Sequence, residues 1–94
     1  MVVGTCVIEL HLPGNGSLKD KRRIIQSIIR RVQNTFNVSI AEVGAQDLWQ
    51  RAELGMACVS ISQELAHRLL SSVVEWITEH YPQVELIDYR IEIL

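Results

Sequence analysis

The fold of this chain is decided by residues 2–34, which read VVGTCVIELHLPGNGSLKDKRRIIQSIIRRVQN. Alternate positions of residues 2–12 are apolar, which is the period-two pattern of a half-buried strand. Residues 13–16, PGNG, break that pattern as a tight loop does. Ser17 is a typical helix N-cap, and apolar residues then recur at helical spacing to about Asn34. The stretch therefore predicts a strand, a loop and an amphipathic helix.

The rest of the chain adds three strands and a second helix. The strands are expected at residues 38–43, 54–61 and 84–94, and the helix at residues 63–80. A polar connection at residues 44–51 separates the second and third strands, and Pro82 ends the second helix. The order β-α-β-β-α-β is the split βαβ pattern of the ferredoxin-like fold. We therefore expect one α+β domain over residues 1–94, with two helices on one face of a four-stranded antiparallel sheet.

Composition bounds the class of protein. The 94 residues are 48% hydrophobic and 21% charged, which is ordinary for a globular domain. The N-terminal apolar run is far too short for a membrane span and lacks the flanks of a secretion signal, so a cytoplasmic protein is expected. Cys6 and Cys58 lie in separate apolar runs without a CxxC motif, and we expect both to be free and buried.

The sheet face that the helices do not cover is expected to be open. Alternate residues of two strands should lie on this face. They are Thr5, Val7, Glu9 and His11 from the first strand, and Asp88, Arg90 and Glu92 from the last. The third strand could present either of two apolar sets there, Leu54, Met56 and Cys58 or Gly55, Ala57 and Val59. Exposed apolar residues are costly on so small a chain, so a homo-oligomer is expected, most simply a dimer joined through this face or a strand edge.

Trp49 lies in the polar connection, two residues before Arg51. A lone Trp in such a place either closes the end of the core or anchors a partner. The core plug is the commoner arrangement, and both readings stay open. Trp49 and Arg51 therefore join Val7 and Arg90 as candidate interface residues.

Charge is unevenly distributed along the sequence. Six of the nine basic residues fall between residues 19 and 31 against one acid, a net +5, whereas the other three face ten acids, a net −7. Clustered Lys and Arg suit a phosphate backbone, and a helix start attracts anions. The candidate RNA-binding residues are Lys19, Lys21, Arg22, Arg23 and Arg30. The alternatives are a solvated helix face whose cations pair with acids elsewhere, and a site for a small phosphorylated ligand.

Several functions lack the residues that they need. RNA readers of this topology stack bases on aromatic residues of the two central strands, and neither expected central strand has one. Acylphosphatases need an arginine in the first loop, and residues 13–17 hold none. The three histidines have no metal-ligand spacing, and no nucleophile–base pair can be read from the sequence. We therefore expect no enzyme activity, no metal and no cofactor.

Four segments resemble a known family, and they extend over nearly the whole chain. They are ELHLPGNGSLKDKRR (9–23), FNVSIAEV (36–43), QDLWQRAELG (46–55) and IDYRIEIL (87–94). Together they resemble the bacterial YlxP-like family, a domain family of unknown function (number 503). The resemblance implies a ferredoxin-like fold and supplies no catalytic residues. In that family the gene often lies among genes for translation initiation and ribosome maturation.

These observations favour a non-enzymatic accessory protein that binds RNA or a ribonucleoprotein, such as a ribosomal particle, in ribosome assembly or translation. The alternative from a different class is a self-associating or protein-binding module that uses the open sheet and the Trp49 connection. A small enzyme acting on a phosphoryl ligand is the third hypothesis. RNA binding should fall steeply with salt, whereas association through the sheet should fall much less.

Overall fold

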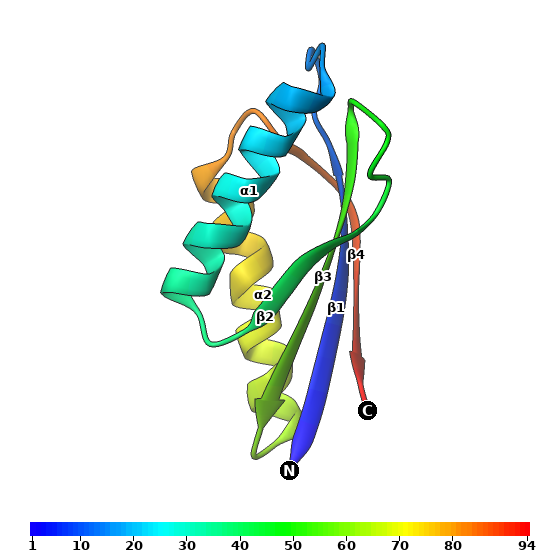
Figure 1. Ribbon diagram of the computed structural model, residues 1–94. Coiled ribbons are helices and arrows are strands. Elements are labelled where there is room, and N and C mark those ends of the chain that lie inside the picture. The colour runs from blue at the N-terminus through cyan, green and yellow to red at the C-terminus, as the bar shows by residue number, and fades with distance from the viewer.

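Strand β1 lies at the centre of the sheet, because it pairs with a strand on each side. The computed structural model describes residues 1–94. The elements in chain order are β1 (Val2–His11), α1 (Leu18–Thr35), β2 (Ser39–Gly44), β3 (Arg51–Ser60), α2 (Gln63–His80) and β4 (Glu85–Ile93). The sheet order is β2-β3-β1-β4 with antiparallel pairs throughout (Figure 1). The predicted ferredoxin-like α+β fold is confirmed.

The register between β3 and β1 decides which side chains face the helices. Leu54 lies opposite Ile8, and Met56 lies opposite Cys6. All four side chains are buried. Because side chains alternate along a strand, Leu54, Met56 and Cys58 face the core, and Gly55, Ala57 and Val59 lie on the open face.

Strand β3 begins at Arg51, three residues earlier than the sequence pattern indicates. Arg51 pairs with His11, the last residue of β1, and the ladder continues to the pair of Ser60 with Val2. Pairing with the long central strand therefore draws charged residues into β3, although their own strand propensity is low.

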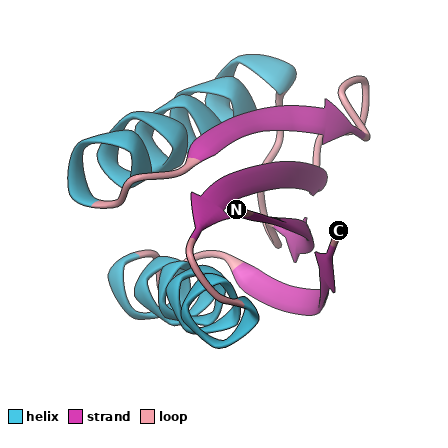
Figure 2. Cartoon of the chain, turned by 90° about the horizontal axis from the view of Figure 1, so that it is seen from below, coloured by secondary structure: helices cyan, strands magenta, loops and turns pink.

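Both helices pack on the same face of the sheet, and the opposite face is open (Figure 2). Nineteen buried residues form one core between the helices and the sheet. Each helix begins at a serine N-cap: the Ser17 hydroxyl accepts from the amide of Asp20 at 3.0 Å, and that of Ser62 from Leu65 at 3.1 Å. Neither helix is both long and apolar enough to cross a membrane.

Candidate nucleic-acid interface

Five cationic side chains lie on the solvent side of α1. We call this set the α1 cationic face, and it consists of Lys19, Arg22, Arg23, Arg30 and Arg31, all exposed. The helix buries its other side, at Lys21, Ile25, Ile28 and Val32. The 3.6-residue repeat separates the two sets, so the cations follow one side of the helix over most of its length.

No carboxylate of the chain forms an ion pair with the α1 cationic face. The four ion pairs of the molecule use other basic residues, namely His11, Lys21, Arg68 and Arg90. Asp20, the one acid on α1, forms no ion pair either. The alternative in which acids elsewhere in the chain pair with the basic run therefore holds only for Lys21, which lies 3.2 Å from a Glu42 carboxylate oxygen.

Three of the arginines line a hollow on α1. It measures about 400 Å³, and its walls are all polar: Arg23, Gln26, Ser27, Arg30 and Arg31. Guanidinium groups bind phosphate through two parallel hydrogen bonds, so a hollow with several of them suits a phosphate group.

Arg31 was not among the predicted RNA-binding residues, and the structure places it at the edge of this hollow. Its guanidinium carbon lies 5.0 Å from the ring centre of Trp76 and 5.2 Å from that of Tyr81. The Tyr81 hydroxyl in turn lies 2.7 Å from the Ser27 hydroxyl. The aromatic contacts orient the Arg31 side chain. Its position next to Arg30 in the basic run was the sequence signal that could have identified it as a candidate RNA-binding residue.

Lys21 is not available to RNA, and its prediction as a binding residue is wrong. The residue is fully buried, on the same helix face as Ile25. Its ammonium donates to the carbonyl of Ala45 at 2.6 Å and to that of Leu48 at 2.7 Å. It also lies 3.2 Å from a carboxylate oxygen of Glu42. The Lys21 ammonium therefore binds groups inside the protein, chiefly carbonyls of the connection between β2 and β3.

That connection, residues 45–50, carries Trp49 into solvent. Trp49 is 53% exposed and Leu48 is 52% exposed, so Trp49 does not close the end of the core. The Asn15 side chain donates to the Trp49 carbonyl at 2.7 Å and to the Ser17 carbonyl at 2.9 Å. The Leu12 amide donates to the Gln50 carbonyl at 2.9 Å. These bonds tie the connection to the loop that precedes α1.

The open sheet face holds three of the predicted interface residues, Val7, Arg51 and Arg90. Val7 and Arg90 lie opposite each other on β1 and β4, and Val7 is half-buried while Arg90 is exposed. The Arg90 guanidinium lies 3.6 Å from a Glu92 carboxylate oxygen on the same strand. Arg51 is exposed at the start of β3, opposite His11, and forms no ion pair.

A shallow hollow of about 430 Å³ lies on the sheet between β1, β3 and β2. Most of its lining is small or apolar, including Val7, Ala41, Val43 and Ala57. A Cβ on Gly55 would lie 2.9 Å from a methyl carbon of Val43, so glycine is what lets Val43 lie flat on the sheet. This part of the open face is apolar and uncharged.

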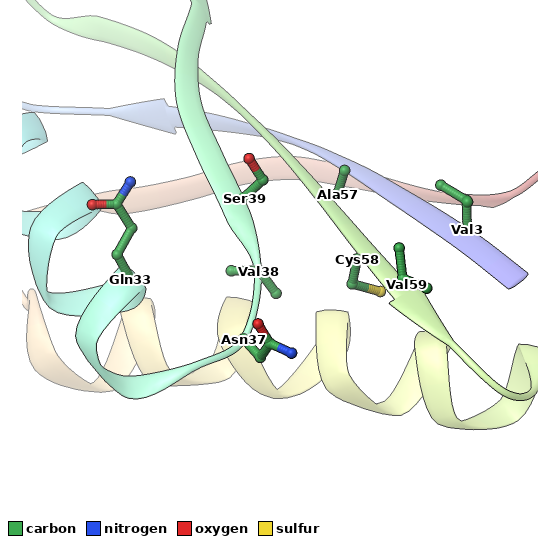
Figure 3. Close-up of a pocket in the computed structure, with 8 residues that line it drawn as sticks. All are labelled: Val3, Gln33, Asn37, Val38, Ser39, Ala57, Cys58 and Val59. Atoms are coloured by element: carbon green, nitrogen blue, oxygen red, sulfur yellow. The ribbon is translucent and has the colours of Figure 1, made fainter. Parts of the chain in front are cut away.

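A second apolar hollow, of about 580 Å³, lies where α1 leads into β2 (Figure 3). Val38, Ala57 and Val59 form much of its wall, and Gln33 and Asn37 supply amide groups. Cys58 is its one titratable residue. The hollow therefore holds no acid–base pair.

Both cysteines are free and buried, as the sequence predicts. Burial raises the pKa of the Cys6 thiol to about 11, although a hydrogen bond from the Arg90 backbone acts in the opposite direction. A thiol with so high a pKa is a poor nucleophile at neutral pH. No three His, Cys, Asp or Glu side chains come together as metal ligands.

A sequence model of the DUF503 family, described as a protein of unknown function, matches residues 3–91. The chain belongs to the DUF503 family. A relative, the uncharacterized protein YlxP of Bacillus subtilis (strain 168), is 41% identical over 91 residues, covering 97% of this chain and 98% of that protein. The resemblance seen in the sequence is thus confirmed.

Similar solved structures share only the fold with this DUF503 protein. A de novo designed ferredoxin-fold protein, LFR1 1, matches with a TM-score of 0.53 and 18% identity over 100% of this chain and 84% of its own. At3g17210 from Arabidopsis thaliana matches at 0.51 and 13%, over 98% and 92%. A VAO-type flavoprotein from Myceliophthora thermophila C1 matches at 0.56 and 9%, over 99% of this chain but 16% of its own. So mixed a set shows that the fold alone does not specify a function.

Proposed function

We propose that this DUF503 protein is a non-enzymatic accessory protein that binds RNA, alone or within a ribosomal particle, during ribosome assembly or translation. The observation that carries the proposal is the α1 cationic face, five exposed cations without a carboxylate partner. Binding of a phosphate backbone to such a row is favourable, because each neutralised phosphate releases condensed counterions. The arginine hollow between Arg23 and Arg31 supplies a seat for one phosphate.

Two sets of three arginines allow a matched test. One variant replaces Arg22, Arg23 and Arg30 with Gln, and the control replaces Arg51, Arg68 and Arg90 with Gln. Both variants change the net charge equally, so a difference between them reports position and not charge. The probes are purified ribosomal subunits and a labelled 12-nucleotide single-stranded RNA, at 50 and 200 mM KCl.

The α1 variant should bind more weakly and with a flatter salt dependence. Each lost contact lowers the log–log salt slope by about 0.7 for single-stranded RNA, or about 2 for three contacts. The control variant should keep most of the affinity and the slope. The proposal fails if the wild type shows no salt-sensitive binding to any of these probes, or if both variants lose affinity equally.

Self-association through the open sheet face is the second candidate function, and the hollow around Val7 and Gly55 favours it. The apolar floor would lie at the centre of the contact, and Glu9, Arg90 and Glu92 would form a polar rim. A second copy of the chain would need to bury about 800 Å² on each partner.

Sedimentation equilibrium at micromolar concentration tests this candidate. A single species at 10.7 kDa rules out a dimer. Val7→Glu should dissociate a dimer that is formed face to face, but should leave a dimer of edge strands largely intact.

A further inference from the structure

The connection between β2 and β3 exposes two adjacent apolar side chains, Leu48 and Trp49. Neither side chain belongs to the hydrophobic core or to the partly buried residues that pack against it. The surrounding residues of the connection are polar: Gln46, Asp47 and Gln50. A half-exposed tryptophan in such surroundings leaves part of its side chain open to a partner.

Side chains from α1 and from the loop before it hydrogen-bond to the backbone of this connection. The buried Lys21 donates to the Ala45 and Leu48 carbonyls, and Asn15 donates to the Trp49 carbonyl. Ala45 takes a left-handed backbone conformation, with φ of 56°, at the residue whose carbonyl receives the shorter Lys21 bond. A loop tethered in this way loses less conformational entropy on binding a ligand than a free loop does, so the arrangement suits recognition.

The connection between β2 and β3 lies at the same end of the molecule as the start of α1 (Figure 1). Asn15 bridges the two, because its amide donates both to Trp49 and to Ser17, the N-cap of α1. Lys19 and Arg22 lie within the first turns that follow that cap. The connection that carries Trp49 is therefore tied to the end of α1 at which its row of cations begins.

We propose that Trp49 stacks on an unpaired base of a single-stranded RNA segment whose phosphates lie along the α1 cationic face. This inference rests on the proposed function and specifies its substrate. Stacking platforms beside a basic groove are the usual way to hold single strands, and every base has a face to stack. The bases of a duplex are already stacked on one another, so Trp49 should contribute little to duplex binding.

The test compares Trp49→Ala with Trp49→Phe and with Leu48→Ala, the adjacent side chain of equal exposure but without an aromatic ring. The probes are the labelled 12-nucleotide single-stranded RNA and its duplex with the complementary strand. Trp49→Ala should weaken single-strand binding about ten-fold or more while the salt slope stays unchanged. Trp49→Phe should retain most of the affinity, Leu48→Ala should change it less than about two-fold, and duplex binding should not respond.

The outcomes separate this inference from the proposed function. If Trp49→Ala binds as tightly as the wild type while the triple arginine variant on α1 does not, stacking is wrong and the cationic face stands. If Leu48→Ala costs as much as Trp49→Ala, the pair acts as an apolar anchor of the kind that proteins bind, and stacking is again wrong. If the wild type binds neither RNA, the stacking proposal fails, and the proposed function fails with it only if ribosomal subunits are not bound either. Equal urea midpoints for all variants confirm that the loop substitutions leave the fold intact.

Discussion

Helices α1 and α2 are matched in length and in capping, yet they use the same position for different purposes. Each has 18 residues and follows a serine N-cap. The first fully buried residue lies four residues after the cap in both helices, and it is Lys21 in α1 and Ala66 in α2. A long charged side chain and a methyl group thus occupy equivalent places in the two halves of the fold.

The difference follows from what each helix start faces. A Cβ on Gly4 of β1 would lie 3.3 Å from that of Ala66 and 3.1 Å from a methyl carbon of Leu70, so α2 approaches the sheet closely and only a small residue fits. The start of α1 faces the connection between β2 and β3 instead, and Lys21 reaches its carbonyls. One position packs a helix on a strand, and the other tethers a loop.

The exposed sides of the helices differ just as much. The α2 side carries three glutamates and one arginine, and Arg68 pairs with Glu64 at 3.1 Å. The α1 side carries five unpaired cations. Since α2 carries no such row of cations, the fold itself does not require a positive helix surface.

Lys21→Met should have the largest effect, a loss of about 3–5 kcal/mol in the free energy of unfolding. The substitution leaves the Glu42 carboxylate without its cation and removes the donor to the Ala45 and Leu48 carbonyls. Urea unfolding measures the loss. The matched control is Lys19→Met in the same helical turn, which should change stability by no more than about 0.5 kcal/mol. Equal stability of the two variants would show that the tether contributes nothing.

The two N-caps should have intermediate and equal effects, because this is where the helices are alike. Ser17→Ala and Ser62→Ala should each lower stability by about 1 kcal/mol, since each removes the acceptor of one amide at a helix start. The two losses should add in the double variant if the sites are independent. A loss of stability in only one of the two single variants would contradict the expectation that the two caps are equivalent.

The last effect is confined to high pH and should come from Cys6, on the face of β1 that the helices cover. Its pKa is about 11 in the folded protein against an ordinary value of 9.0. As the pH rises from about 9 to about 11, the unfolded chain releases the thiol proton while the folded chain keeps it, so stability falls across that window and not below it. Urea unfolding at pH 8.5 and 10.5 measures the fall, and Cys6→Ala should remove this part of it.

Local pattern was enough to predict the elements of this fold. The period of the apolar residues changes from two to 3.6 at Ser17, and α2 begins and ends where the sequence indicates, at Gln63 and His80. The start of β3 was missed because pairing with His11, not propensity, draws Arg51 into the sheet. Long-range pairing of this kind has no signature within the strand itself.

The candidate site was predictable in part. The basic run located the α1 cationic face, but the absence of ion pairs on it required coordinates. Lys21 was misassigned, although its spacing of four residues before Ile25 already placed it on the buried side of the helix. The exposure of Trp49 could not be predicted, since it depends on hydrogen bonds from Asn15 and Lys21, which precede it by about thirty residues in the chain.

The strand order has a consequence for how the molecule comes apart. The chain consists of two similar halves, β1-α1-β2 and β3-α2-β4, joined by the connection that carries Trp49. In the order β2-β3-β1-β4 each strand pairs only with strands of the other half. Neither half can therefore keep a sheet of its own when the other opens, because all its strand pairing is lost with its neighbour. Such interleaving couples the two halves into one cooperative unit, which should unfold in a single all-or-none step.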